Sequence, residues 1–155
     1  MKRLHHVMPE RKATYQEGLS GFEMEEADEH HLINSIYHAD LVMTAGSTFA
    51  IDAAVFDKPI ICIAFDGTAK NVPYWVSVKR FYDCYTHFEA LLETGGVRLA
   101  SSPEQLAVEM NRALDHPSLE KNERKKIIEL LVAPFDGHAS ERLEHLLTQE
   151  VKKLL

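Results

Sequence analysis

Cysteine and basic side chains are scarce in this sequence, and both shortages narrow the function classes to be considered. Two cysteines, Cys62 and Cys84, occur in 155 residues and form no CxxC pair. This pattern does not suggest a disulfide framework and fits a reducing compartment, so we expect a cytoplasmic protein. The 17 basic residues are outnumbered by 24 acidic ones, which gives a net charge of -7. Nonspecific binding to nucleic acid or to an anionic membrane needs a basic excess, so neither partner is expected.

Long apolar runs and the common phosphate-binding and nucleophile motifs are also missing. No stretch reaches the roughly 18 consecutive apolar residues of a membrane-spanning helix, so no transmembrane segment is expected. The charged N-terminus is not followed by an apolar stretch, which argues against a signal peptide. Walker A and GxGxxG patterns are absent, so the sequence lacks the phosphate loops of ATPases and dehydrogenases. GxSxG is not met either, which excludes a nucleophile elbow.

Nine histidines raise the question of a metal site. His31 and His38 have the spacing of one helical face, and His30 is adjacent, but there is no HExxH motif and no Cys/His cluster. We therefore interpret these histidines as surface or interface residues. Neither a metal ion nor a cofactor is predicted.

The composition, with 45% hydrophobic and 26% charged residues, suits one domain with one hydrophobic core. We expect a single domain over 1–155, in which 1–25 is a poorly defined segment with a candidate short strand at 4–8. Apolar runs predict strands at 41–44, 60–65 and 97–100, and 66–84 is interpreted as an irregular segment. Helical periodicity predicts helices at 28–37, 47–56, 86–96, 102–114, 118–132 and 138–155.

Capping residues support several of these helix boundaries. Asp28 is a candidate cap for the first helix, and Ser47 begins the second. The stretch from Thr86 to Glu89 has capping-box spacing. Ser102, followed by a proline and then by Gln105, combines an N-cap, a proline at the first helical position and a second capping box.

Strands that alternate with helices form βαβ units, which are built on parallel pairing. We therefore predict an α/β fold with a Rossmann-like parallel sheet, flanking helices and a helical C-terminal tail. The segments 41–45, 60–65 and 97–100 are expected to be parallel neighbours.

The turn after the first strand is the strongest candidate for a ligand site. A buried strand ends there in small residues, and a helix follows at once with Ser47 and Thr48 in its first turn. Free backbone N–H groups and the helix dipole suit a phosphate or a carboxylate, and Gly46 allows close approach. In open α/β sheets, ligands bind at the carboxyl ends of the strands. The alternative is that Ser47 only caps the helix and that Asp52 is only a solvated helix residue.

A family resemblance adds to this interpretation. The run from Asp40 to Thr48 (DLVMTAGST), followed by an acidic residue at Asp52 and by Lys58-Pro59, resembles the C-terminal domain of two-domain (GT-B) glycosyltransferases. The similarity is to enzymes of bacterial surface-polymer synthesis, including the CDP-glycerol glycerophosphotransferases. The later stretch DGHASER, at 136–142, resembles their Asp-Gly-x-Ala-Ser-x-Arg element. Together these features cover roughly residues 26–145.

The resemblance implies that the chain is half of a GT-B fold and binds a nucleotide-diphosphate sugar or a CDP-glycerol-type small molecule. By position, the implied phosphate contacts are Gly46, Ser47 and Thr48. Asp52 would contact a donor hydroxyl or order the turn. The second element contributes Asp136, Gly137 and Ser140, which serve either ligand contact or domain closure. No catalytic residue is assigned, and the family generally works without a catalytic metal.

Two further features have alternative interpretations. His87 matches a histidine region of the family and either binds a donor or acceptor hydroxyl or is only a helix-start residue. The aromatic residues in 74–82 either line an acceptor groove, touch lipid, bury against a partner, or simply pack beneath the long loop.

A complete enzyme of this family also has an acceptor domain, and the first strand and helix of the donor domain have no clear counterpart here. We therefore expect a homodimer or a separate acceptor-domain subunit, and no transferase activity from the chain alone. The candidate contact residues are Leu4, Val7, Tyr74, Trp75 and Phe81. The alternative function is a non-catalytic binding or assembly module that keeps only the fold.

Overall fold

The computed structural model describes residues 26–69 and 71–154 of the chain. The chain forms two units, Met1–Asn34 and Ser35–Leu155. The described part of the first unit is the beginning of helix α1 (Glu26–His38), whose last residues belong to the second unit. The strand expected at 4–8 lies outside the described residues, as do the candidate contact residues Leu4 and Val7.

A three-stranded parallel sheet is the centre of the second unit. Its strands are β1 (Val42–Thr44), β2 (Ile60–Ile63) and β3 (Arg98–Ala100), in the order β1-β2-β3. Val42 lies opposite Ile60, and Cys62 lies opposite both Thr44 and Leu99. The prediction of three parallel neighbours is therefore confirmed. Since all three strands run the same way, their carboxyl ends share one edge of the sheet.

The central strand is buried, as its unbroken apolar sequence predicts. Ile60, Ile61 and Cys62 are each at most 2% exposed. The thiol of Cys62 has its pKa raised to about 11 by this burial, which makes it a small apolar side chain at neutral pH. In β1, successive side chains point to opposite faces of the sheet, and Val42 is buried while Met43 is exposed.

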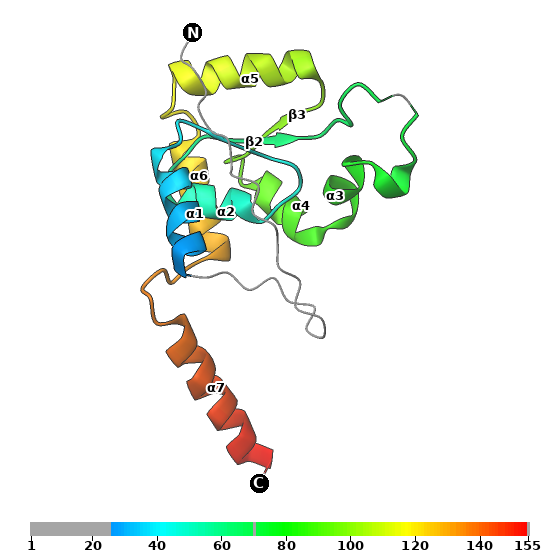
Figure 1. Ribbon diagram of the computed structural model, residues 1–155. Helices are drawn as coiled ribbons and strands as arrows, with labels where there is room; N and C mark the ends of the chain where they lie inside the picture. The colour runs from blue at the N-terminus through cyan, green and yellow to red at the C-terminus, as the bar shows by residue number, and fades with distance from the viewer. Residues whose placement is uncertain (1–25, 70, 155) are drawn as a thin grey trace. The chain divides into compact units, whose positions relative to one another are not determined.

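Helices cover both faces of the sheet. Their bounds are α2 (Phe49–Val55), α3 (Lys79–Cys84), α4 (Thr86–Glu93), α5 (Pro103–Asp115), α6 (Lys121–Leu131) and α7 (Ala139–Leu154), with a short 3-10 helix η1 (Tyr74–Val76). Figure 1 shows α5 on one face and α2, α4 and α6 on the other. This layered α/β arrangement is consistent with a Rossmann-like fold. None of the described helices has the length and apolar content needed to cross a bilayer.

On the face of the sheet that α2, α4 and α6 cover, the packing of the core depends on a row of small side chains on α2. Ala50, Ala53 and Ala54 follow the i, i+3, i+4 spacing of one helical face and are at most 1% exposed. Because alanine is small, the backbone of α2 can approach α6, where Ile127 is fully buried. Helix α4 adds Phe88, also fully buried, to the same core.

The segment 66–84 is more regular than expected. It was interpreted as irregular, but it contains η1 and the helix α3. The polar and aromatic sequence of α3 has no clear amphipathic period, so its helix is fixed by tertiary contacts rather than by a local pattern. These contacts involve the turn that follows β1.

Several helix starts differ from the predictions by one or two residues. The Thr86 capping box is wrong, because Tyr85 is the N-cap of α4 and Thr86 lies inside the helix. Helix α1 already includes Glu26, so Asp28 lies in its first turn and not at its cap. Helix α2 begins at Phe49, with Thr48 and not Ser47 as its N-cap.

The start of α5 agrees best with its capping signal. The Ser102 hydroxyl accepts a hydrogen bond from the Gln105 N–H at 3.1 Å, as predicted. The Gln105 side chain returns to the N–H of Ser101 at 3.0 Å, one residue before the position that a capping box requires.

Candidate functional site

The candidate turn lies at the carboxyl edge of the sheet, directly after β1. Gly46 has a φ of +58°, a left-handed conformation that glycine adopts without steric cost. The Ser47 hydroxyl accepts a hydrogen bond from the Phe49 N–H at 3.2 Å, and its carbonyl accepts one from Ala50 at 3.1 Å. These bonds hold the turn in a compact form and join it to the first turn of α2.

Two backbone donors of this turn have no partner in the part of the chain that the structure describes. Neither the N–H of Ser47 nor that of Thr48 donates a hydrogen bond to a residue within 26–69 or 71–154. Both residues are exposed, so a ligand from solvent can reach them. Backbone N–H groups that lack an internal partner are suited to binding an anion.

The N–H of Gly46, in contrast, already has a partner from α3. It donates to the Tyr82 hydroxyl at 3.0 Å, and that hydroxyl donates in turn to the carbonyl of Ile63 at 2.8 Å. Burial raises the pKa of Tyr82 above its ordinary value, so the hydroxyl keeps the proton that it donates. Phe81 is so close that a methyl group added to Gly46 would lie 2.5 Å from its Cβ. A phosphate therefore reaches Gly46 only if α3 moves.

Helix α3 is held in this position by Asp66, which follows β2. The Asp66 carboxylate accepts hydrogen bonds from the Ser77 hydroxyl and from the Val78 N–H, both at 2.7 Å. Ser77 is buried, at 8% exposed, so the two hydrogen bonds are partly shielded from solvent. Asp66 thus fixes the start of α3 and, through it, the aromatic residues over the turn.

Aromatic contacts connect the turn to His87. The ring of Phe81 lies 5.4 Å from that of Tyr85, which lies 5.6 Å from His87, measured between centroids. His87 is exposed in the first turn of α4, so its ring is available to a ligand. The guanidinium of Arg80 lies 5.9 Å from the centroid of Phe81, which puts a cationic side chain near the turn.

Asp52 lies in the first turn of α2 and makes no ion pair with the described residues. Partial burial raises the pKa of its carboxyl group above the ordinary value of 3.8. Among the described residues the carboxylate therefore has no cationic partner, and it lies on the helix that begins at the candidate turn.

The second predicted element, around Asp136, is closed on itself. Both oxygens of Asp136 lie 2.8 Å from the Arg142 guanidinium, and one accepts the N–H of His138 at 3.0 Å. Arg142 also donates to the carbonyl of Pro134 at 3.2 Å. The bond from Arg142 lowers the pKa of Asp136, with a smaller effect from His138. This pairing fixes the loop before α7.

The other two residues of that element take part differently. Gly137 has a φ of +78°, which suits glycine in the loop, and Ser140 is exposed near the start of α7. No contact recorded among the described residues joins Gly137 or Ser140 to the turn at 46–48. Their assignment to a common site remains a prediction.

A surface cavity of about 280 Å³ lies between α3 and α4. It shares Tyr82 with the turn, and its other lining residues include Cys84, Tyr85 and Glu89. Drug-sized ligands usually occupy pockets of about 300 Å³ or more, so this volume suits part of a nucleotide-sized molecule. Among the described residues, no group of histidine, cysteine and carboxylate side chains is arranged to hold a metal ion.

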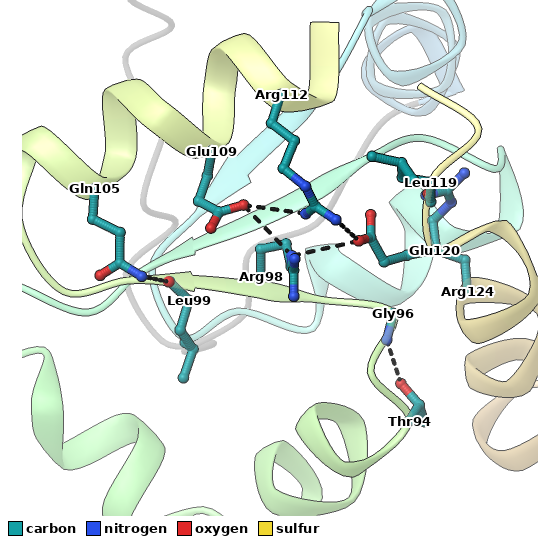
Figure 2. A network of polar contacts seen from close by, with 10 residues as sticks. All are labelled: Thr94, Gly96, Arg98, Leu99, Gln105, Glu109, Arg112, Leu119, Glu120 and Arg124. Carbon is teal, nitrogen blue, oxygen red and sulfur yellow. Dashed lines mark hydrogen bonds and ion pairs between the residues drawn. The ribbon is translucent and has the colours of Figure 1, made fainter. Parts of the chain in front are cut away.

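The amino edge of the sheet holds an ion-pair network and not a ligand site. In Figure 2, Arg112 lies between Glu120 and Glu109, at 2.6 and 3.4 Å, and Arg98 lies 3.5 Å from both carboxylates. The cavity enclosed there measures about 10 Å³, which is about the size of one water probe. With two positive and two negative groups, the network neutralises itself and joins β3 to α5 and to the start of α6.

Next to this network, Arg124 of α6 is buried at 1% exposed (Figure 2). It binds Asp57, which terminates α2 in a left-handed conformation with a φ of 52°. Burial alone would raise the pKa of Asp57, but hydrogen bonds from Lys121 and Arg124 outweigh it and hold the pKa below 3.8. Sequence reasoning missed this pair because a charged residue in a helix is usually exposed.

Comparisons of the chain with models of known protein families, with curated proteins and with solved structures found no match. The functional interpretation therefore rests on the site itself. Of the predicted site residues, Gly46, Ser47 and Thr48 form one turn, and Asp52 follows on the helix after it. Tyr82 and Asp66 were not predicted as site residues, because only the folded chain brings them to the turn.

Proposed function

We propose that this chain is a donor-binding domain of a glycosyltransferase-like or glycerophosphotransferase-like enzyme. It binds a nucleotide-diphosphate sugar or glycerol with the phosphates at the 46–48 turn. The observation that carries the proposal is a pair of N–H groups, on Ser47 and Thr48, that have no partner among the described residues and lie at the carboxyl edge of a parallel sheet.

The surroundings of the turn suit a phosphate-bearing ligand. Arg80 supplies positive charge through its position over Phe81, and the cavity beside Tyr82 offers room for a further part of the ligand. In a transfer reaction, backbone N–H groups and a cationic side chain in these positions stabilise the negative charge that develops on the leaving phosphate. The acceptor would come from a second domain or subunit, so we predict no transfer by this chain alone.

A non-catalytic binding or assembly module is the second candidate, and one observation favours it. The Tyr82 hydroxyl already satisfies the N–H of Gly46, and Phe81 fills the space beside that glycine. Because the N–H of Gly46 is bonded within the chain, the turn can serve to hold α3 in place without binding a ligand. The two candidates differ in whether a nucleotide-linked donor binds at all.

A thermal-shift screen with UDP-, CDP- and GDP-linked donors separates the two candidates. A ligand at about 100 times its Kd adds about 2.7 kcal/mol of stability. For a domain of this size, the melting temperature then rises by roughly 5 to 10 °C. The donor-binding proposal expects this rise with at least one donor, whereas the assembly module expects none.

Two variants at one position locate the binding. Thr48 has a φ of -58°, which suits proline, and its N–H has no partner among the described residues. Thr48→Pro therefore removes one proposed donor without removing an internal hydrogen bond. Thr48→Ala is the matched control, since it removes the hydroxyl and keeps the N–H. We expect the donor response to be lost in Thr48→Pro and kept in Thr48→Ala; an equal response in both variants would refute the assigned site.

A further inference from the structure

Helix α7, drawn in red in Figure 1, carries an exposed stripe of apolar side chains. Leu143, Leu146, Leu147 and Val151 each expose between 55% and 58% of their surface. Leu143, Leu147 and Val151 follow one another at four-residue intervals, so they lie on one face of the helix. An apolar stripe of this kind on a polar helix marks an interaction surface.

The size of the stripe suits contact with a second copy of the chain. Each exposed aliphatic side chain offers roughly 100 Å² of apolar surface, so the four provide roughly 400 Å² per chain. Two copies together then bury roughly 800 Å² of apolar surface. Because apolar atoms make up about 65% of a homodimer interface, the whole contact is roughly 1,200 Å², which exceeds the roughly 1,000 Å² that a specific interface needs.

Internal ion pairs determine which charges of α7 remain for a partner. In the first half of the helix, Arg142 is bound by both oxygens of Asp136. In the second half, Glu150 lies 2.5 Å from Lys153. These pairs neutralise one basic residue of the first half and one acidic residue of the second.

The charges left over have opposite signs in the two halves. Glu141 lies 3.1 Å from His138, so its charge is partly matched within the chain; Glu144 leaves the first half acidic, and Lys152 leaves the second half basic. An antiparallel pair of α7 helices brings each acidic half beside the basic half of the other copy, and it also opposes the two helix dipoles favourably. A parallel pair would bring like charges together.

We infer that α7 is the contact between two copies of this chain, which pair antiparallel about Leu147. In this arrangement Leu143 packs against the partner's Val151, and the two Leu147 side chains meet on the two-fold axis. Such a contact is isologous and closes as a dimer. The inference does not depend on donor binding and assigns the expected dimer to residues other than the aromatic candidates Tyr74, Trp75 and Phe81.

Light scattering of the purified chain tests the contact. At tens of micromolar we expect twice the 17.6 kDa mass of one chain, and the monomer mass for Leu147→Glu. Val108→Glu is the matched control, because Val108 is 63% exposed on another helix. This control should remain a dimer. A wild-type monomer, or a Leu147→Glu dimer, would overturn the inference, and so would dissociation by Trp75→Glu with Leu147→Glu intact.

Single cysteines test the antiparallel register in a Cys84→Ser background, in which Cys62 is the remaining cysteine and is buried. Leu147→Cys should form a disulfide-linked dimer on mild oxidation. Leu143→Cys should not, because the two copies of position 143 lie about 12 Å apart along the helices. A mixture of Leu143→Cys and Val151→Cys chains should cross-link again. Efficient cross-linking of Leu143→Cys alone would mean a parallel pair and would overturn the proposed arrangement.

Discussion

Replacing Arg124 by alanine is the most severe single perturbation that this structure suggests. Arg124 is 1% exposed, and its guanidinium makes three hydrogen bonds and one further ion-pair contact. Nε and Nη2 lie 2.9 and 2.8 Å from one Asp57 oxygen, and the carbonyls of Leu119 and Pro117 accept bonds at 2.6 and 3.1 Å. The side chain thereby connects the end of α2, the loop before α6 and α6 itself.

The magnitude follows from what Arg124→Ala leaves behind. Two carbonyl groups lose their donor, and the removed side chain leaves an unfilled space under the sheet. Asp57 loses its closest partner but is 43% exposed and still lies 3.0 Å from Lys121, so water and lysine compensate for part of its charge. Breaking a buried ion pair from one side costs about 3 to 5 kcal/mol. Since a domain is stable by about 5 to 15 kcal/mol, this loss is a large share of the total.

Urea unfolding followed by circular dichroism measures this loss. With a denaturant slope of about 2 kcal/mol per molar, the midpoint should fall by roughly 1.5 to 2.5 M. Lys125→Ala is the control, because the Lys125 side chain is 74% exposed and reaches Glu129 only at 3.9 Å. The free energy of unfolding of this control should change by less than about 0.5 kcal/mol. If Arg124→Ala were no more costly than the control, the burial and pairing of Arg124 described above would be wrong.

Three further predictions follow from the described contacts. Because the pKa of Asp57 is held below 3.8, its ion pair contributes fully to the free energy of unfolding above that pH, and the contribution is lost as the pH falls through the folded pKa. Asp57→Asn should therefore lose less stability on acidification than the wild type does. Urea midpoints measured from pH 6 downward test this. Tyr82→Phe should lower the free energy of unfolding by about 1 to 3 kcal/mol in urea unfolding, since the partly buried N–H of Gly46 and carbonyl of Ile63 both lose their partner. Alkylation followed by mass spectrometry should modify Cys84, which is exposed, and leave Cys62 unmodified until the chain unfolds; rapid labelling of both would contradict the buried central strand.

The secondary structure was largely predictable because most elements carry a local signal. The unbroken apolar run at 60–63 identifies the buried strand, and the small residues of α2 follow a helical period. Parallel pairing followed from the helix between successive strands, because a short hairpin cannot connect parallel neighbours. The helix start at Ser102 was also predictable from local sequence, because its capping hydrogen bond comes from Gln105, only three positions away.

The contacts that define the candidate site were less predictable because they join distant parts of the chain. Tyr82 binds Gly46 across 36 positions, and Arg124 binds Asp57 across 67. No periodicity or capping rule relates residues so far apart. The helix α3 was missed for the same reason, since Asp66 and the aromatic packing fix it. The position of the turn at the sheet edge was predicted, whereas the side chains that surround it were not.

The most direct test of donor binding at the turn is a titration of the isotope-labelled chain with nucleotide-diphosphate donors, followed by amide NMR. We predict that the amide signals of Ser47 and Thr48 shift in a saturable way with at least one nucleotide-linked donor, because their N–H groups bind its phosphates. Unchanged Ser47 and Thr48 signals with every donor, or saturable shifts confined to other residues, would contradict it.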